Sequence, residues 1–251
     1  MKIDFKKYEK NGWIKIKNFI HPKKIQMMDK NVKYFLEKNF MNYESRFINF
    51  VNNQKNFKNI NSFHKLDDCK WIKNYSKSSK LTNFVKKILK TKSIKLRQAE
   101  YFAKPKKRGL AAPDHQDNFF WNLNDSNAIT IWISLSNSSK KNGGVYYYDA
   151  SHKYGILNHK KSYMKGTSQM IKNKKFLKNF NISLPSLKRG DALIHHSLIV
   201  HGSKKNKSQF SRKGITFQYI TKNAKIDKIR AKIYEKNLYK QIKFRNLNAG
   251  L

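Results

Sequence analysis

The spacing of apolar residues changes about a third of the way along the chain. Up to residue 93, apolar side chains mostly recur every three or four positions, which predicts amphipathic helices. A short helix should come first, followed by a strand over residues 13–17, where apolar and polar side chains alternate. Further helices should begin near Pro22 and cover residues 80–90. We therefore expect residues 1–93 to be mainly helical.

From residue 94 onward, the apolar residues fall in short runs separated by turn residues. The runs are 94–102, 128–135, 144–148, 191–200 and 214–221. Runs of this length and composition predict strands, and several strands with no helices between them predict a sandwich or jelly roll. We therefore expect a mainly β core over residues 94–221.

Residues 222–251 return to helical spacing and are strongly basic. Ile226, Ile229, Ile233 and Leu238 fall on one face of the predicted C-terminal helix, and we expect that face to pack on the sheet. The connection over residues 151–186 is rich in Lys and Asn and longer than most loops, which makes it a candidate lid. The length suits one core, so we predict a single domain over residues 1–251.

The formal charge of +40 comes from 55 Lys and Arg against 15 Asp and Glu. Such an excess would suit a basic protein that binds nucleic acid. However, the lysines are dispersed along the whole chain and accompany many Asn and Ile residues, whose codons share A/T-rich composition. No groove-reading motif is present. We therefore expect a solvated lysine surface and no specific nucleic-acid partner, and a small-molecule substrate that could be anionic.

Cys69 is the only cysteine, which excludes an internal disulfide and a cysteine-based zinc site. The first ten residues are charged and lack the apolar stretch of a signal peptide. No run approaches the roughly eighteen apolar residues of a membrane span. These features predict a cytoplasmic protein with no membrane span.

Candidate metal ligands lie at two places in the β region. His115 and Asp117 are two residues apart, and such residues point the same way in an extended segment. His201 directly follows the apolar run 192–200, where a strand can present a ligand at its end. Two His and one carboxylate on one face of an octahedron form the site of non-haem iron(II) oxygenases. His195 and His196 are alternative ligands by composition, but we expect them to be structural or to line the cavity.

Arg212 follows His201 by eleven positions and lies next to a predicted strand. A guanidinium pairs with a carboxylate through two parallel hydrogen bonds. Arg212 is therefore suited to bind the distal carboxylate of 2-oxoglutarate while the keto-acid end of that co-substrate chelates iron.

With these residues in place, the chain resembles the phytanoyl-CoA dioxygenase family of iron(II)- and 2-oxoglutarate-dependent oxygenases. The likeness extends from the opening helix and strand, residues 8–20, to Arg212. The motifs that carry it are Lys104-Pro105, Asp114-His115-Gln116-Asp117, Trp132 in its strand, Asn142-Gly143-Gly144, Ser151-His152-Lys153, Arg189-Gly190-Asp191 and His201-Gly202-Ser203.

The resemblance implies a jelly roll of the double-stranded β-helix, cupin-like type. It also implies that His115, Asp117 and His201 bind iron(II) and that Arg212 binds 2-oxoglutarate. Dioxygen would be the other co-substrate, and the reaction would yield succinate and a hydroxylated small molecule. Secondary contacts to 2-oxoglutarate are implied for Ser203, Gln116 and Trp132, although Ser203 could instead turn the chain, Gln116 brace the loop and Trp132 belong to the core.

Two positions bear on which oxidation is expected. Asp117 keeps the carboxylate that related halogenases replace with a small residue, which argues against halogenation. Asp149-Ala150 stands where the family usually has Pro-Gly, beside the aromatic run 146–148, so the namesake acyl-CoA substrate is not expected. Phe119, Phe120 and Trp121 could wall the site, and Lys104, Arg108 and Lys153 could meet an anionic substrate.

Two other classes of function remain open on the sequence alone. One is a metal-binding jelly roll with non-oxidative chemistry or none, which would not need Arg212. The other is a basic nucleic-acid-binding protein, whose binding would depend on salt and not on His115 or His201.

Overall fold

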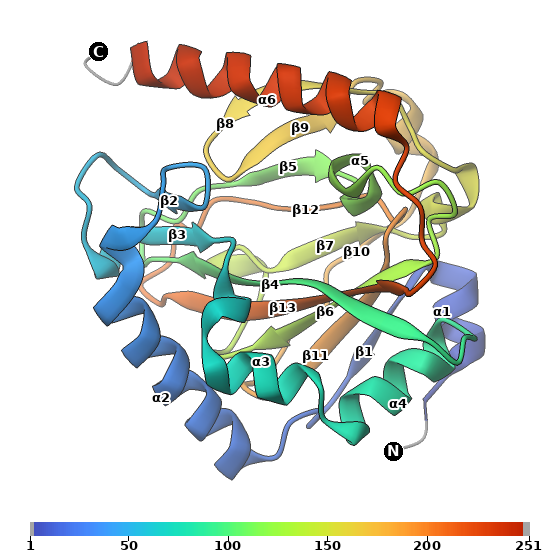
Figure 1. The fold of residues 1–251 in the computed structure, drawn as a ribbon, viewed down its shortest axis with the longest axis horizontal. Coiled ribbons are helices and arrows are strands. Elements are labelled where there is room, and N and C mark those ends of the chain that lie inside the picture. The colour runs from blue at the N-terminus through green and yellow to red at the C-terminus, as the bar shows by residue number, and fades with distance from the viewer. Residues whose placement is uncertain (1–2, 248–251) are drawn as a thin grey trace.

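The computed structural model describes residues 3–247, and for 245–247 it describes the backbone only. A large antiparallel sheet forms its centre (Figure 1). The spatial order of the strands in this sheet is β1 (Trp13–Ile16), β11 (Ala192–His196), β6 (Ala128–Ser134), β13 (Arg212–Thr221), β4 (Ile94–Lys104), β3 (Ile60–Phe63) and β2 (Ile48–Phe50).

A smaller antiparallel sheet lies against one face of the large sheet (Figure 1). Its strands are, in spatial order, β10 (Ile182–Ser183), β7 (Val145–Tyr148), β12 (His201–Ser203) and β5 (Ala112–His115). A separate hairpin, β8 (His159–Met164) and β9 (Thr167–Ile171), lies beside β5. Two facing antiparallel sheets confirm the predicted mainly β, jelly-roll fold with flanking helices.

Helices cover the other face of the large sheet. They are α1 (Phe5–Asn11), α2 (Pro22–Asn39), α3 (Lys70–Ser76) and α4 (Ser79–Ile88). Short 3-10 turns occur at Phe40–Asn42, Phe57–Asn59, Leu66–Asp68, Lys140–Asn142, Ser151–Tyr154 and Phe176–Asn179. The expected helices near Pro22 and over 80–90 are present. The first third also supplies three strands of the large sheet, of which only the first was expected.

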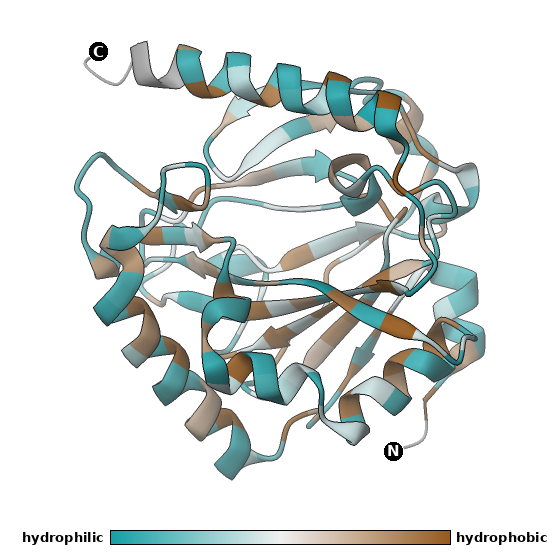
Figure 2. Ribbon diagram, viewed as in Figure 1, coloured by the Kyte–Doolittle hydropathy of each residue, from teal (hydrophilic) through white to brown (hydrophobic). Residues whose placement is uncertain are grey.

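The alternation of side chains along the large sheet separates its two faces. On β13, Ile215 and Phe217 join the core beneath the helices, whereas Thr216 and Gln218 line a cavity between the sheets. β6 is buried on both faces over its whole length. Figure 2 accordingly shows the hydrophobic colour concentrated on strands of the large sheet. The face of the large sheet that borders the cavity thus carries polar side chains, whereas the face beneath the helices is apolar.

The predicted strand over residues 191–200 is wrong in one respect that matters for the site. β11 ends at His196, the chain turns, and His201 begins β12 in the other sheet. The Ile199 N–H donates to the carbonyl of His196, which closes this turn. The passage from the large to the small sheet could not be recognised from the sequence, because residues on both sides of the turn are buried and apolar.

The last helix, α6 (Lys228–Leu247), crosses above the small sheet and the β8–β9 hairpin (Figure 1). The predicted apolar face is only partly correct, because Ile226, Ile229 and Ile233 are exposed. Leu238 does face inward, where it borders the cavity with Tyr234 and Ile242. α6 therefore packs through a different set of side chains and over the cavity.

Residues 151–186 form the β8–β9 hairpin, β10 and two 3-10 turns. This segment is therefore structured, and its closure over the site stays a prediction. Among the described residues, the helices include none that is long and apolar enough to cross a membrane.

Candidate active site

Three candidate metal-ligand atoms lie close together where the adjacent strands β5 and β12 of the small sheet meet α5 (Asp117–Trp121). His115 ends β5, His201 begins β12 directly opposite it, and Asp117 opens the short helix α5. Oδ1 of Asp117 lies 3.8 Å from Nε2 of His115 and 3.7 Å from Nε2 of His201. The ligand atoms of all three residues lie within 4.8 Å of one another. This spacing allows one metal ion to contact all three.

Backbone carbonyls orient both imidazoles toward that point. Nδ1 of His115 lies 2.7 Å from the carbonyl oxygen of Pro113, and Nδ1 of His201 lies 3.1 Å from that of Ile199. A proton on Nδ1 satisfies each carbonyl and leaves the lone pair of Nε2 for a metal. The donor set, two imidazoles and one carboxylate, suits iron(II) and leaves other coordination positions open.

The second carboxylate oxygen of Asp117 is held by the large sheet. Thr130 donates to Oδ2 at 2.5 Å, and His195 Nε2 lies 3.1 Å from the same oxygen. His195 in turn contacts the Tyr147 hydroxyl at 2.9 Å. Burial acts to raise the pKa of Asp117, but His201, His195 and His115 together lower it below the ordinary value. Asp117 is therefore ionised and fixed in one orientation.

Burial also keeps His201 neutral. Loss of solvent lowers the pKa of His201 well below its ordinary value, and the neighbouring His115 adds to this effect. A neutral imidazole is the form that binds a metal. His195 lies beside the ligand group but hydrogen-bonds to the carboxylate, as a residue that orients a ligand does.

Arg212 lies in the same cavity with an unsatisfied hydrogen-bond donor. The side chain is 3% exposed, and its Nε is buried with no hydrogen-bond partner among the described residues. Its guanidinium lies 4.8 Å from the centre of the Trp132 ring. Burial lowers the pKa of Arg212 to about 10, so the group is charged at neutral pH. A buried guanidinium without a carboxylate at ion-pair distance in residues 3–247 is suited to bind an anion.

A glycine makes room for the ring beside Arg212. A Cβ at Gly214 would overlap the Trp132 ring, so a side chain at position 214 would displace the indole. Gly214 and Arg212 are both on β13, and Trp132 is on the neighbouring strand β6. The glycine at position 214 thus leaves room for the Trp132 ring to lie beside Arg212.

Of the predicted secondary contacts, Ser203 and Trp132 line the cavity and Gln116 does not. The Gln116 amide donates to the carbonyls of Gly155 and Leu198 and accepts from the N–H of Leu157. These bonds use its side-chain amide on backbone groups. The structure therefore gives no support to the predicted co-substrate contact of Gln116 and favours the alternative that it braces the loop.

Three cations suggested for an anionic substrate lie elsewhere. Lys104 is buried, and its Nζ donates to the carbonyls of Leu110 and Lys204 at 2.6 Å each. Burial, followed by the charge of Arg212, lowers the pKa of Lys104. Arg108 and Lys153 are exposed and do not belong to the cavity lining. The structure thus does not support substrate contacts for these three residues.

Lys104→Met should destabilise the protein by about 1–3 kcal/mol, because the two carbonyls would lose their hydrogen-bond donor inside the protein. Urea denaturation followed by circular dichroism measures this change. The matched control is Lys106→Met, since Lys106 is exposed two residues away. Equal urea midpoints for the two variants would contradict the structural role of Lys104.

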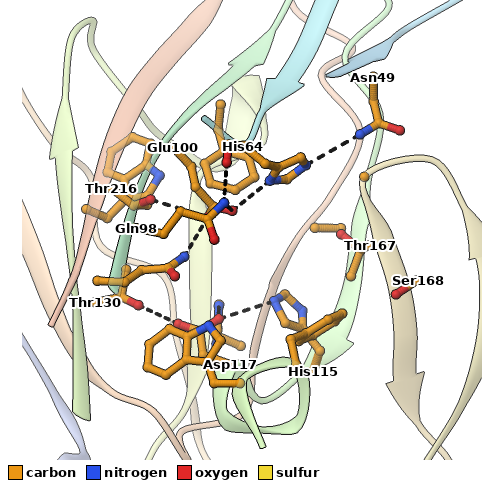
Figure 3. A pocket seen from close by; sticks show the side chains of 18 of the residues that line it. Asn49, His64, Gln98, Glu100, His115, Asp117, Thr130, Thr167, Ser168 and Thr216 are labelled. Carbon is orange, nitrogen blue, oxygen red and sulfur yellow. Dashed lines mark hydrogen bonds and ion pairs between the residues drawn. The ribbon is translucent and has the colours of Figure 1, made fainter. Parts of the chain in front are cut away.

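The cavity that contains the metal-ligand group and Arg212 measures about 320 Å³. Both sheets, the β8–β9 hairpin and α6 contribute to its walls. Phe120 and Trp121 line it as expected, whereas Phe119 stacks on His159 with ring centres 3.9 Å apart. Figure 3 shows a second polar group across the cavity from His115 and Asp117, formed by His64, Gln98 and Glu100. None of these three was predicted.

A family model, phytanoyl-CoA dioxygenase, matches residues 8–214 of the chain. Phytanoyl-CoA dioxygenase domain-containing protein 1 of Danio rerio is 24% identical over 191 residues, which cover 74% of this chain and 64% of that protein. The peroxisomal phytanoyl-CoA dioxygenase of Rattus norvegicus is 27% identical over 118 residues, 45% of this chain and 34% of that protein. The chain thus matches less than two thirds of the length of these relatives.

Solved structures share the fold at low sequence identity. EctD from S. alaskensis, solved with 2-oxoglutarate and 5-hydroxyectoine, superposes with a TM-score of 0.74 at 15% identity, covering 89% of this chain and 77% of EctD. SnoK, a non-haem α-ketoglutarate-dependent carbocyclase from nogalamycin biosynthesis, gives a TM-score of 0.69 at 15% identity, covering 88% of this chain and 84% of SnoK. These likenesses support the jelly-roll fold.

Proposed function

The chain belongs to the phytanoyl-CoA dioxygenase family, and from that premise we propose that it is an iron(II)- and 2-oxoglutarate-dependent oxygenase that hydroxylates a small molecule. The observation that carries this proposal is the placement of two complementary sites in one cavity. Three metal-ligating atoms converge at one place, and the unpaired guanidinium of Arg212 lies in the same space. A metal-binding jelly roll without this chemistry would have no need of the second site.

Each residue has a defined part in the proposed site. His115, Asp117 and His201 would hold iron(II), and Arg212 would bind the distal carboxylate of 2-oxoglutarate beside Trp132. When bound, the metal and co-substrate supply the activation of dioxygen that couples decarboxylation of 2-oxoglutarate to substrate oxidation. The protein would position both molecules and exclude water, with α6 and Phe120 forming part of the cavity wall.

Hydroxylation is favoured over halogenation because Asp117 occupies the position of the carboxylate ligand. Its Oδ2 is engaged by Thr130 and His195, so the side chain cannot turn away without breaking these bonds. A halide would need the coordination position that Oδ1 of Asp117 is placed to fill. The cavity wall opposite His115 is polar, which does not suit the apolar acyl chain of the namesake acyl-CoA substrate.

Anaerobic addition of iron(II) and 2-oxoglutarate should produce a visible metal-to-ligand charge-transfer band. Admission of air should then yield succinate, even without substrate. The band should not appear with iron(II) alone or with 2-oxoglutarate alone. Absence of both the band and succinate in the wild-type protein would refute the proposed function.

A further inference from the structure

Arg97 enters the cavity because of a β-bulge in β4. In the pairing with β13, Gln218 lies opposite Gln98, and the next residue of β13, Tyr219, lies opposite Leu96. Arg97 therefore has no partner in β13 and is an extra residue in β4. Leu96 and Ala99 both pack on the helix side of the sheet, whereas Arg97 and Gln98 both line the cavity. A β-bulge redirects a side chain in this way and is common beside active sites.

The guanidinium of Arg97 is held in place but not neutralised. Its Nη1 donates to Oε1 of Gln218 at 2.7 Å and to Oε1 of Gln98 at 3.1 Å. Its centre lies 5.2 Å from the centre of the Trp121 ring. Nε and Nη2 have no hydrogen-bond partner among residues 3–247, and within the same range no carboxylate is at ion-pair distance from Arg97.

The two carboxylates with the largest electrostatic effect on Arg97, Glu100 and Asp117, interact with other groups. Glu100 accepts hydrogen bonds from His64 at 2.7 Å and from Gln218 at 2.6 Å (Figure 3). Asp117 belongs to the metal-ligand group and accepts from Thr130. Loss of solvent lowers the pKa of Arg97, and Glu100 partly counteracts this effect. A cation held in this way, without a paired anion, is expensive to bury unless a ligand supplies the anion.

Arg97 and Arg212 mark two separate anion positions. Arg97 bonds to Gln218, and Arg212 begins the same strand six residues earlier (218 − 212 = 6). Six residues of an extended strand span roughly 20 Å between Cα atoms, so the two guanidinium groups are anchored far apart along β13 compared with the length of a small dicarboxylate. Arg97 lies nearer to Asp117 along the strands. Gln218, which accepts from Arg97, pairs with Thr130, and Thr130 donates to Asp117.

We propose that Arg97 binds an acidic group of the substrate and that the enzyme acts on compact molecules carrying a carboxylate, phosphate or sulfonate. This inference rests on the proposed function in one respect: it assumes that iron(II) and 2-oxoglutarate bind in the same cavity. Gln98 and Gln218 fix the guanidinium so that Nε and Nη2 present parallel donors to an anion. The cavity of about 320 Å³ must also hold 2-oxoglutarate, which limits the substrate to a small body.

The test uses the charge-transfer band of the anaerobic iron(II)–2-oxoglutarate complex as the readout. The probes are matched pairs of an acid and a neutral analogue: cyclohexanecarboxylate with its carboxamide, phenyl phosphate with phenol, and methanesulfonate with dimethyl sulfone. A probe that binds beside the metal shifts the band, whereas a probe that displaces 2-oxoglutarate abolishes it. At least one acid should shift the band of the wild-type protein, and its neutral partner should not.

Three variants assign the effect to Arg97. In Arg97→Gln the acid should bind at least about tenfold more weakly, in line with loss of a charge-assisted pair, and Arg97→Lys should be intermediate. Arg108→Gln is the matched control, because Arg108 is exposed outside the cavity and should behave as wild type.

Several results would overturn the proposal. They are failure of every acid to shift the wild-type band, equal shifts by acids and their neutral partners, and unchanged acid binding in Arg97→Gln. Loss of the band itself in Arg97→Gln would place Arg97 in the co-substrate site and would also overturn it. Failure of the proposed function is distinguishable, because the wild-type protein would then show no band before any probe is added.

Discussion

Arg212→Gln should weaken the binding of 2-oxoglutarate by roughly 30-fold to 4,000-fold, which corresponds to about 2–5 kcal/mol for removal of one partner from a buried charge pair. The physical reason is the isolation of the guanidinium. Arg212 is buried, its Nε is unpaired, and the Trp132 ring packs against it. A glutamine fills part of the volume but carries neither the charge nor the paired donors that match a carboxylate.

Titration of 2-oxoglutarate into the anaerobic iron(II)-loaded protein, followed by the charge-transfer band, measures this loss. Arg212→Lys should fall between wild type and Arg212→Gln, because it keeps the charge and loses the fork of donors. Iron binding itself should persist in both variants, since Arg212 does not belong to the metal-ligand group. Wild-type affinity in Arg212→Gln would show that another residue binds the distal carboxylate.

His201→Ala should lower the affinity for iron(II) by about 100-fold or more and abolish succinate formation. Loss of a ligand should exceed the roughly 10- to 100-fold effect typical of removing a residue that only orients a ligand. His195→Ala provides that comparison in the same cavity, because His195 contacts Oδ2 of Asp117 and lies outside the metal-ligand group. His195→Ala should therefore show the smaller loss.

Equilibrium dialysis against iron(II) under anaerobic conditions gives the two affinities. Circular dichroism melts of the metal-free variants check that both still fold. An iron affinity reduced more by His195→Ala than by His201→Ala would contradict the assignment, because it would make His195 the ligand and His201 the residue that orients it.

Strands with alternating apolar residues were predictable, and those without such a pattern were not. The runs that became β4, β6 and β13 lie in the centre of the large sheet, where β-branched residues are buried. β5 reads Ala-Pro-Asp-His and β8 reads His-Lys-Lys-Ser-Tyr-Met. β5 gains its pairing from β12, which is distant in sequence, and β8 pairs with the next strand, β9, without a clear alternation of apolar residues. A local pattern therefore shows neither strand.

The metal-ligand group could be predicted because its residues lie at spacings along the sequence that are typical of such a site. His115 and Asp117 lie two residues apart, and His201 precedes Arg212 by eleven. Arg97 had no comparable signal. By simple alternation it would share a face with Ala99 and point beneath the helices, and only the register between β4 and β13 reveals the extra residue. Glu100 and His64 were missed because their contact joins residues 36 positions apart.

The metal-ligand group lies at the boundary between the two sheets. His115 and His201 belong to the small sheet, while Asp117 is tied by hydrogen bonds to Thr130 and His195 of the large sheet. An ion bound by all three residues would therefore join the two halves of the sandwich, and its binding free energy would add to the stability of their association. Iron occupancy would then govern resistance to unfolding as well as chemistry, and the metal-free chain would be the form most readily removed by proteolysis.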